Sequence, residues 1–268
     1  MRYMGSKARI LKHILPIMLF ERQPDQWWVE PFVGGGNVIE NVWGKRLGAD
    51  INPYVIEALI LIRDAPETIP DLITEEDYKK LQEERNVDGL TGIVGFGMSF
   101  GSKWFGGYAR NKKGMVGDTK NMKTQTRRVK DGAIEQSPKL QGCVFVNKSY
   151  LELEIPDNSL IYCDPPYQGV TSYKDTLNHE EFWGWCRDMD EKGHTVFVSE
   201  YNAPDDFECI WEKELRVGFI KWNQRMPDPK QISFDNFFGE EWAKQIRESI
   251  DRDTGVIYNV EKLFRCRK

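Results

Sequence analysis

Short apolar runs alternate with amphipathic segments along much of the chain, and this rhythm predicts strands that alternate with helices. The pattern predicts strands at residues 27–30, 46–50, 143–146, 160–163 and 195–199. It predicts helices at residues 9–20, 37–43, 53–64, 75–85 and 179–191, the second capped by Asn37. Residues 255–265 predict strands at the edge of the sheet. Because strand, glycine-rich turn, helix and strand follow one another, we expect a βαβ unit and a parallel sheet.

The rhythm stops in the middle of the chain. Residues 88–139 are rich in Gly, Lys and Arg, with aromatic residues interleaved, and residues 111–114 are typical of a hairpin turn. We therefore predict an α/β domain formed by residues 1–66 and 143–268, with an inserted domain formed by residues 67–142.

Composition agrees with this organisation and excludes several classes of protein. The chain has 268 residues, 40% of them hydrophobic, which suits one large α/β domain carrying an insertion. Its apolar stretches are too short to span a membrane, and its first residues lack the apolar core of a signal peptide, so we expect a cytoplasmic protein without membrane contact. Five Cys without Cys-x-x-Cys spacing and three scattered His predict neither disulfides nor a metal site.

Charge is distributed unevenly along the chain. The net charge is −5, yet residues 101–142 hold ten basic and three acidic residues, a local charge of +7 against −12 for the remainder. Contact with a polyanion requires a local basic face rather than a basic total. Charge alone leaves open whether this segment binds nucleic acid or is a solvated surface loop.

A glycine-rich turn follows the first predicted strand, at residues 31–36. Such a turn lets the backbone approach a ligand, but its spacing differs from the dinucleotide fingerprint, and no phosphate-binding Lys-Ser/Thr follows it. Asp50 ends the next strand, about 20 residues after the turn begins, where an acidic side chain can bind ribose hydroxyls. Asp50 is equally placed to cap the helix that begins near Pro53.

The tetrapeptide Asp164-Pro165-Pro166-Tyr167 directly follows a predicted buried strand. Its two prolines fix an extended exit from the strand, and neither carries an N–H. The Asp164 carboxylate and the Pro165 carbonyl can then accept both hydrogens of an exocyclic amine, while Tyr167 offers a face on which a base can stack. Ligand sites of open α/β sheets lie at such strand ends. The alternative is a rigid surface turn.

These motifs together resemble the Dam-type DNA adenine N6-methyltransferases. The tetrapeptide is preceded by residues 29–36 and 49–52, which match the family's glycine-rich turn and acidic strand end. Residues 2–7 resemble its N-terminal aromatic-x-Gly-x-Lys motif, and residues 259–264 resemble its closing segment. A basic insertion lies where the family carries its target-recognition domain. The motifs occur in the family's order over the whole chain.

The resemblance implies a Rossmann-like methyltransferase sheet with helices on both faces, and a flipped-out adenine in double-stranded DNA as the substrate. It implies that the residues lining the S-adenosylmethionine pocket are Tyr3, Lys7, Glu30, Pro31, Phe32, Gly34, Gly36, Asp50, Ile51 and Asp164. The catalytic residues would be Asp164, Pro165, Pro166 and Tyr167. The candidates for contacts to DNA are Lys103, Arg110, Asn111, Lys112, Lys113, Lys120, Lys123, Arg127 and Arg128. We expect a monomer or weak dimer, acting alongside a restriction nuclease or on a phage genome.

Other readings of the same motifs remain. Cytosine N4-methyltransferases usually carry Ser in place of Asp164, and RNA adenine or protein glutamine methyltransferases usually carry Asn there. A catalytically silent DNA-binding protein of the same fold would not require all four motifs. A dinucleotide-dependent oxidoreductase is disfavoured by the glycine spacing. The insertion also departs from the family's usual recognition sequence at Trp104, Phe105 and Tyr108, so the DNA sequence that it reads is not predicted.

Overall fold

The computed structural model describes residues 1–110, 119–168, 177–219 and 256–266. The chain divides into two compact units, Met1–Ile161 and Tyr162–Lys268. The predicted hairpin turn at residues 111–114 lies outside the described residues. No helix in the described part of the chain is both long and apolar enough to cross a membrane.

The strands form one mixed sheet in the order β3-β2-β1-β4-β5-β7-β6. In the first unit β1 pairs in parallel with β2 and with the start of β4, and β2 pairs in parallel with β3. The strand order reverses at β1 and β4, as it does in doubly wound α/β sheets. The predicted Rossmann-like α/β sheet is therefore confirmed. The strands are β1 (Trp28–Glu30), β2 (Arg46–Asp50), β3 (Cys143–Asn147), β4 (Leu160–Cys163), β5 (Thr195–Glu200), β6 (Phe207–Phe219) and β7 (Val256–Cys266).

Three helices of the first unit begin at residues whose side chains cap them. Asn52 caps α2, accepting the Tyr54 N–H at 3.1 Å, and Pro53 occupies the first turn. Thr74 and Asp77 form a capping box that begins α3. The α-helices of this unit are α1 (Leu11–Glu21), α2 (Pro53–Asp64), α3 (Glu75–Glu84), α4 (Gly89–Gly97) and α5 (Thr119–Leu140). Short 3₁₀ turns lie at Lys7–Arg9, Ile39–Asn41, Pro66–Thr68 and Phe100–Ser102.

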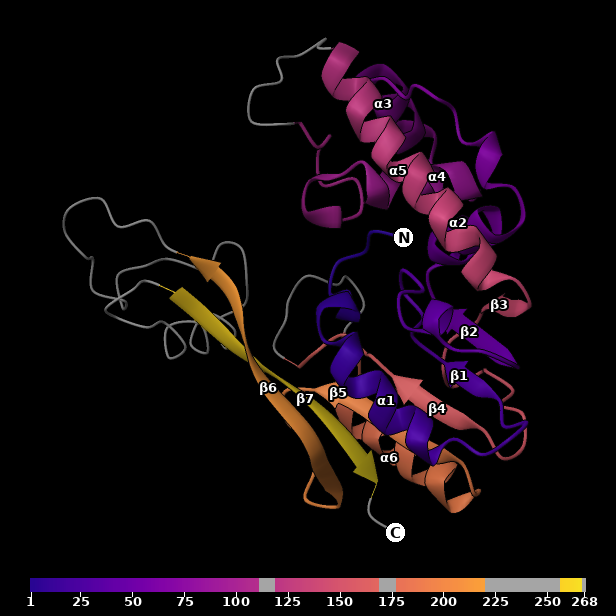
Figure 1. Ribbon diagram of the computed structural model, residues 1–268, viewed down its shortest axis with the longest axis vertical. Coiled ribbons are helices and arrows are strands. Elements are labelled where there is room, and N and C mark those ends of the chain that lie inside the picture. Colours follow the sequence, from indigo (N-terminus) through magenta and orange to yellow (C-terminus); the bar gives the residue numbers. More distant parts are fainter. Residues whose placement is uncertain (111–118, 169–176, 220–255, 267–268) are drawn as a thin grey trace, which may run out of the picture. The chain divides into compact units, whose positions relative to one another are not determined.

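The glycine-rich segment after Asp88 is a buried helix, α4, which packs with α2, while α5 runs along α2 (Figure 1). A Cβ added at Gly92 would lie 2.2 Å from the Tyr54 carbonyl oxygen. Glycine thus allows α4 to approach the backbone of α2 more closely than any other residue would, and this contact holds the middle of the chain against the first βαβ unit.

The second unit holds α6 (His179–Glu191), which Asn178 caps, and an antiparallel part of the sheet. β7 pairs with β5 from Phe197↔Arg265 to Glu200↔Lys262, and with β6 along its full length. The prediction that residues 255–265 lie at the sheet edge is therefore wrong: β7 lies inside the sheet and β6, which was not predicted, covers it.

The predicted helix at residues 37–43 is also wrong. Only one 3₁₀ turn, Ile39–Asn41, forms there, and its N-cap residue is Val38. The Asn37 side chain does not cap it and instead donates to the Met1 carbonyl oxygen at 3.2 Å. The Asn37 side chain therefore makes a tertiary hydrogen bond to the N-terminal segment in place of the capping hydrogen bond that we predicted.

Candidate functional site

The glycine-rich turn after β1 is held close to the N-terminal segment. The Val33 N–H donates to the Ala49 carbonyl at 2.8 Å, which ties the turn to β2. Gly34 has a φ of 47°, and a Cβ there would lie 3.0 Å from the Tyr3 ring. A Cβ at Gly35 would lie 2.7 Å from the Met1 carbonyl oxygen. The structure thus brings Tyr3 against the turn and leaves no room for side chains between them.

Asp50 joins the end of β2 to this turn. Its Oδ2 accepts the Gly34 N–H at 3.1 Å, and its Oδ1 accepts the Asn52 N–H at 2.9 Å. Burial raises the pKa of the Asp50 carboxyl to about 6, and these two backbone hydrogen bonds oppose the rise. Asp50 does not cap α2, because Asn52 does. The carboxylate is therefore fixed beside the turn, and its environment makes it sensitive to pH in the neutral range.

The remaining predicted cofactor residues differ in exposure. Lys7 is 7% exposed, and its ammonium donates to the Gly5 carbonyl at 3.1 Å. Glu30 is buried and accepts the indole N–H of Trp28 at 2.7 Å. Phe32 packs on Tyr150 with ring centroids 5.3 Å apart, whereas Ile51 is 64% exposed. Pro31 and Gly36 are buried in the turn itself.

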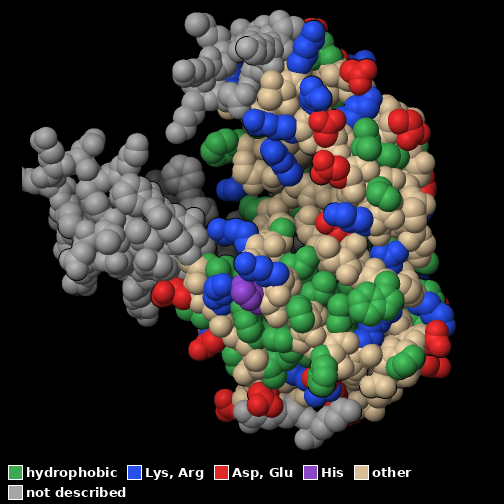
Figure 2. Space-filling view, in the orientation of Figure 1, with side chains coloured by type: hydrophobic (Ala, Val, Ile, Leu, Met, Phe, Trp, Pro, Cys, Tyr) green, Lys and Arg blue, Asp and Glu red, His purple; other side chains and the backbone are tan. Residues whose placement is uncertain are grey.

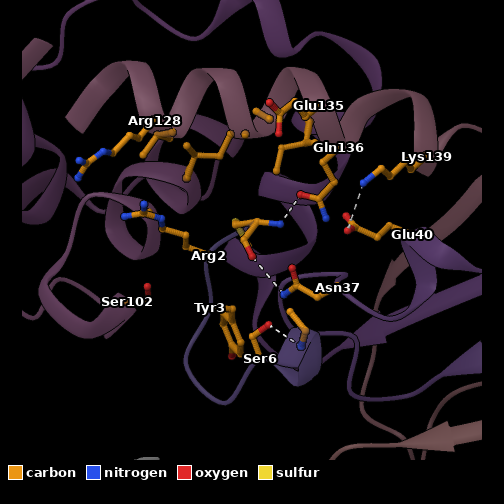
Figure 3. A pocket seen from close by; sticks show the side chains of 18 residues that line it. Arg2, Tyr3, Ser6, Asn37, Glu40, Ser102, Arg128, Glu135, Gln136 and Lys139 are labelled. Carbon is orange, nitrogen blue, oxygen red and sulfur yellow. Dashed lines mark hydrogen bonds and ion pairs between the residues drawn. The ribbon is translucent and has the colours of Figure 1, made fainter. Parts of the chain in front are cut away.

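A cavity of about 420 Å³ opens between the N-terminal segment and α5 (Figure 3). Tyr3, Ser6 and Asn37 line it on one side, and Arg128 and Gln136 line it from α5. The Gln136 amide donates to the Gly35 carbonyl at 3.0 Å, so α5 contacts the turn directly. Helix α5, at the end of the predicted insertion, therefore lies beside the glycine-rich turn. The sequence of α5 did not indicate this contact.

The second unit holds the tetrapeptide that follows β4. Pro165 is buried, while Asp164, Pro166 and Tyr167 are partly exposed. The Tyr167 hydroxyl donates to Oε2 of Glu261 at 2.9 Å, and its ring meets that of Tyr201 edge-on, with centroids 4.5 Å apart and planes at 83°. Burial raises the pKa of Tyr167 well above its ordinary value, and the nearby carboxylates of Asp164 and Glu261 raise it further. The phenol therefore stays protonated and acts as a donor.

Sequence reasoning missed the residues that support this segment. Glu200 ends the buried strand β5, Tyr201 directly follows it, and Glu261 lies on β7. Glu200 is 2% exposed and accepts the N–H of Gln168 at 3.2 Å and of Tyr201 at 2.7 Å. A Glu at the end of an apolar strand was a sign of a role for Glu200. The contact of Glu261 depends on a pairing 94 residues away, for which no local pattern exists.

The predicted DNA contacts divide into several groups. The Arg110 guanidinium makes two 2.6 Å hydrogen bonds to the Glu75 carboxylate and holds the pKa of that carboxyl below its usual range. Arg127 pairs with Asp131 at 3.2 Å on the exposed side of α5. The side chains of Lys103, Lys123 and Arg128 are exposed. Asn111, Lys112 and Lys113, and the side chain of Lys120, lie outside what the structure describes.

Basic and acidic side chains are interspersed on the face of the first unit shown in Figure 2. Lys130 pairs with Asp71 at 2.6 Å, and Lys139 with Glu40 at 3.8 Å, so acidic residues outside the 101–142 segment offset part of its charge. Within the described ranges, no group of three or more His, Cys, Asp or Glu side chains is arranged to hold a metal ion.

Comparisons with known proteins agree with the motifs. Residues 3–90 match the family model for D12 class N6 adenine-specific DNA methyltransferases. DNA adenine methylases from two Vibrio cholerae serotype O1 strains, Classical Ogawa 395 and El Tor Inaba N16961, are 27% identical to the chain over 195 residues, which covers 66% of this chain and 68% of theirs. Two structures of the rRNA methyltransferase aviRa from Streptomyces viridochromogenes show 14% and 13% identity and TM-scores of 0.39 and 0.38, covering 81% of this chain and 83% of theirs.

The family match begins at Tyr3 and includes the glycine-rich turn and Asp50, so it covers the part of the chain in which those motifs were found. The family model, over residues 3–90, and the two relatives support the predicted resemblance to the Dam-type, D12 class adenine-specific DNA methyltransferases.

Proposed function

We propose that this protein transfers a methyl group from S-adenosylmethionine to the N6 amino group of a flipped-out adenine in double-stranded DNA. The observation that carries the proposal is the Asp164-Pro165-Pro166-Tyr167 segment directly after the buried strand β4, in a chain whose residues 3–90 match the D12 class family model. The two relatives are named for adenine methylation of DNA, and the intact Asp164 agrees with an amine substrate. The similarity to this methyltransferase family implies that S-adenosylmethionine is the cofactor.

The residues of the first unit suit the cofactor. Each Asp50 oxygen accepts one backbone N–H and retains a lone pair, so the carboxylate can also accept hydrogen bonds from two ribose hydroxyls. Tyr3 and Lys7 would line the pocket, together with Ile51 and the turn from Glu30 to Gly36. When bound, S-adenosylmethionine supplies an electrophilic methyl group on a sulfonium.

Asp164 and Pro165 would make the amine nucleophilic. The lone pair of adenine N6 is delocalised into the ring, and hydrogen bonds from its two hydrogens to the Asp164 carboxylate and the Pro165 carbonyl favour a tetrahedral nitrogen. The lone pair is then localised and directed at the methyl group. The Asp164 carboxylate would offset the positive charge that N6 acquires until one N6 proton passes to water, while the cofactor's sulfur would be left as a neutral thioether. Positioning and electrostatics supply most of the rate, and no covalent enzyme intermediate is required.

The DNA duplex would be held by the predicted insertion, residues 67–142. An adenine inside a duplex cannot reach such a pocket, so the base would rotate out of the stack and lie on Tyr167. Exposed basic side chains such as Lys123 and Arg128 would contact phosphates. Arg110 would contact a base edge only after exchanging its pair with Glu75, which makes it a costlier DNA contact than Arg128.

Expression in a bacterial host that lacks adenine methylation tests the proposal. Single-molecule sequencing of the host DNA should find N6-methyladenine at a defined sequence with the wild-type protein and none with Asp164→Ala. The variant should melt at the wild-type temperature, because Asp164 is partly exposed. N4-methylcytosine would instead support the cytosine enzyme. Unmodified DNA with the wild-type protein, or full modification with Asp164→Ala, would refute the assignment.

A further inference from the structure

The hydroxyl of Tyr167 is anchored by a residue far away in the chain. Its donor contact to Glu261 Oε2, 2.9 Å long, joins the segment after β4 to the middle of β7. β7 is fixed on both sides by backbone pairing, with Glu261 opposite Lys213 of β6 and the neighbouring Lys262 opposite Glu200 of β5. The acceptor is therefore carried by a rigid element rather than by a loop.

The ring and the backbone beside it are held as well. Tyr201 meets the Tyr167 ring edge-on at 4.5 Å. The buried carboxylate of Glu200 accepts the N–H of Tyr201 and the N–H of Gln168, one residue after Tyr167. These contacts fix the backbone on one side of Tyr167 and restrict rotation of its ring. The hydroxyl contact to Glu261 fixes the far end of the ring, so the side chain is held at both ends.

We propose that Glu261 is a positioning residue for base flipping, which sets the plane of the Tyr167 ring so that the extruded adenine stacks with its amine at Asp164. The proposal rests on the proposed function. A hydrogen bond to a carboxylate is shorter and stronger than one to a neutral acceptor, so it can hold a ring that would otherwise turn. A stacked base must be placed within a fraction of an ångström for transfer, which makes the orientation of its platform a determinant of rate.

A double-mutant cycle on duplex DNA carrying the mapped site tests this role. Glu261→Gln should lower the single-turnover rate of methyl transfer about tenfold, equivalent to about 1.4 kcal/mol. Tyr167→Phe removes the same hydrogen bond from the other side and should lower the rate by a similar factor while it keeps the aromatic face. Adding Glu261→Gln to Tyr167→Phe should then change the rate less than twofold. The dissociation constant for S-adenosylmethionine should stay at the wild-type value in all three variants.

Glu212→Gln is the matched control, because Glu212 is an exposed carboxylate on the adjoining strand β6 and should leave the rate unchanged. If Glu261 had a merely structural role, Glu261→Gln would lower the melting temperature. Its rate loss would then multiply with the rate loss from Tyr167→Phe in the double variant. An unchanged rate in Glu261→Gln, or losses that multiply in the double variant, would overturn the inference while the wild-type protein still methylates DNA. A wild-type protein without methylation would refute the proposed function instead. If Glu261→Gln does not fold, a wild-type rate in Tyr167→Phe still overturns the inference.

Discussion

Lowering the pH from 7 to 5 should weaken binding of S-adenosylmethionine, because Asp50 would lose its charge in that range. Burial raises the pKa of this carboxyl from 3.8 to about 6, against the two backbone hydrogen bonds from Asn52 and Gly34. In the protonated form one oxygen becomes a donor, and the group accepts hydrogen bonds from ribose hydroxyls less well. The perturbation therefore acts on one identified side chain.

The magnitude follows from the titration. A group with a pKa of about 6 is roughly nine-tenths ionised at pH 7 and roughly one-tenth ionised at pH 5, so affinity should fall by up to tenfold, or about 1.4 kcal/mol. Stability should change in the opposite direction. Because the folded-state pKa is raised, the contribution of Asp50 to stability is fully present below pH 3.8 and is lost as the pH rises through about 6. That loss is at most about 3 kcal/mol, and solvent screening of the partly exposed carboxylate reduces it.

Isothermal titration calorimetry with S-adenosylmethionine between pH 5 and pH 8 measures this dependence. The wild-type protein should bind more tightly as the pH rises, whereas Asp50→Asn should bind weakly at every pH, with a flat profile. Asp157→Asn, at an exposed position, is the control and should keep the wild-type profile. A flat profile in the wild-type protein, or a wild-type slope in Asp50→Asn, would show that Asp50 does not hold the ribose in its ionised form.

Three further predictions concern the turn and the DNA contacts. Gly35→Ala should lower the free energy of unfolding by about 1–3 kcal/mol, because the added Cβ would lie 2.7 Å from the Met1 carbonyl; an unchanged melting temperature in a thermal scan would contradict the close packing. Arg128→Ala should weaken DNA binding and reduce the slope of log K against log salt by about 1, with no change in melting temperature. Salt titrations that show no loss of slope for Arg128→Ala would exclude Arg128 from the DNA interface. Arg110→Ala, by contrast, should lower the melting temperature in a thermal scan, because it leaves Glu75 without its two hydrogen bonds from Arg110.

Elements with a purely local pattern were predictable from the sequence. The bounds of β2, β4, α2 and α6 match the prediction, because each joins a clear apolar pattern to a turn residue such as Asn52 or Asn178 at its boundary. The tetrapeptide after β4 was found for the same reason, since its chemistry lies in four consecutive residues. The contact of Tyr3 with the glycine-rich turn was not predicted, because it joins segments about 30 residues apart that share no local pattern.

Features that depend on distant partners were not predictable. Four glycines in α4 disfavour a helix locally, yet the helix forms because its tertiary packing outweighs this low propensity. The close neighbours that require glycine are α2 at Gly89 and Gly92, Trp104 at Gly95 and Val129 at Gly97. Asn is a residue type that often caps helices, but the Asn37 side-chain amide donates to the Met1 carbonyl and caps no helix. The position of β7 between β5 and β6, and with it the contact of Glu261 to Tyr167, is a property of strand order, on which hydrophobic periodicity carries no information.

The place of β7 has a consequence for how the protein is made. Roughly 55 residues separate the end of β5 from the start of β7, so at ordinary translation rates of about 5–20 residues per second several seconds pass between the two. During that interval β5 has an open edge, which is a template for pairing with other chains. The same late strand brings Glu261 to Tyr167, so a nascent chain that has already formed Asp164 and its neighbours still lacks the hydrogen bond that anchors the Tyr167 hydroxyl. Protection of the β5 edge and anchoring of Tyr167 should therefore arise together, when β7 is added to the sheet.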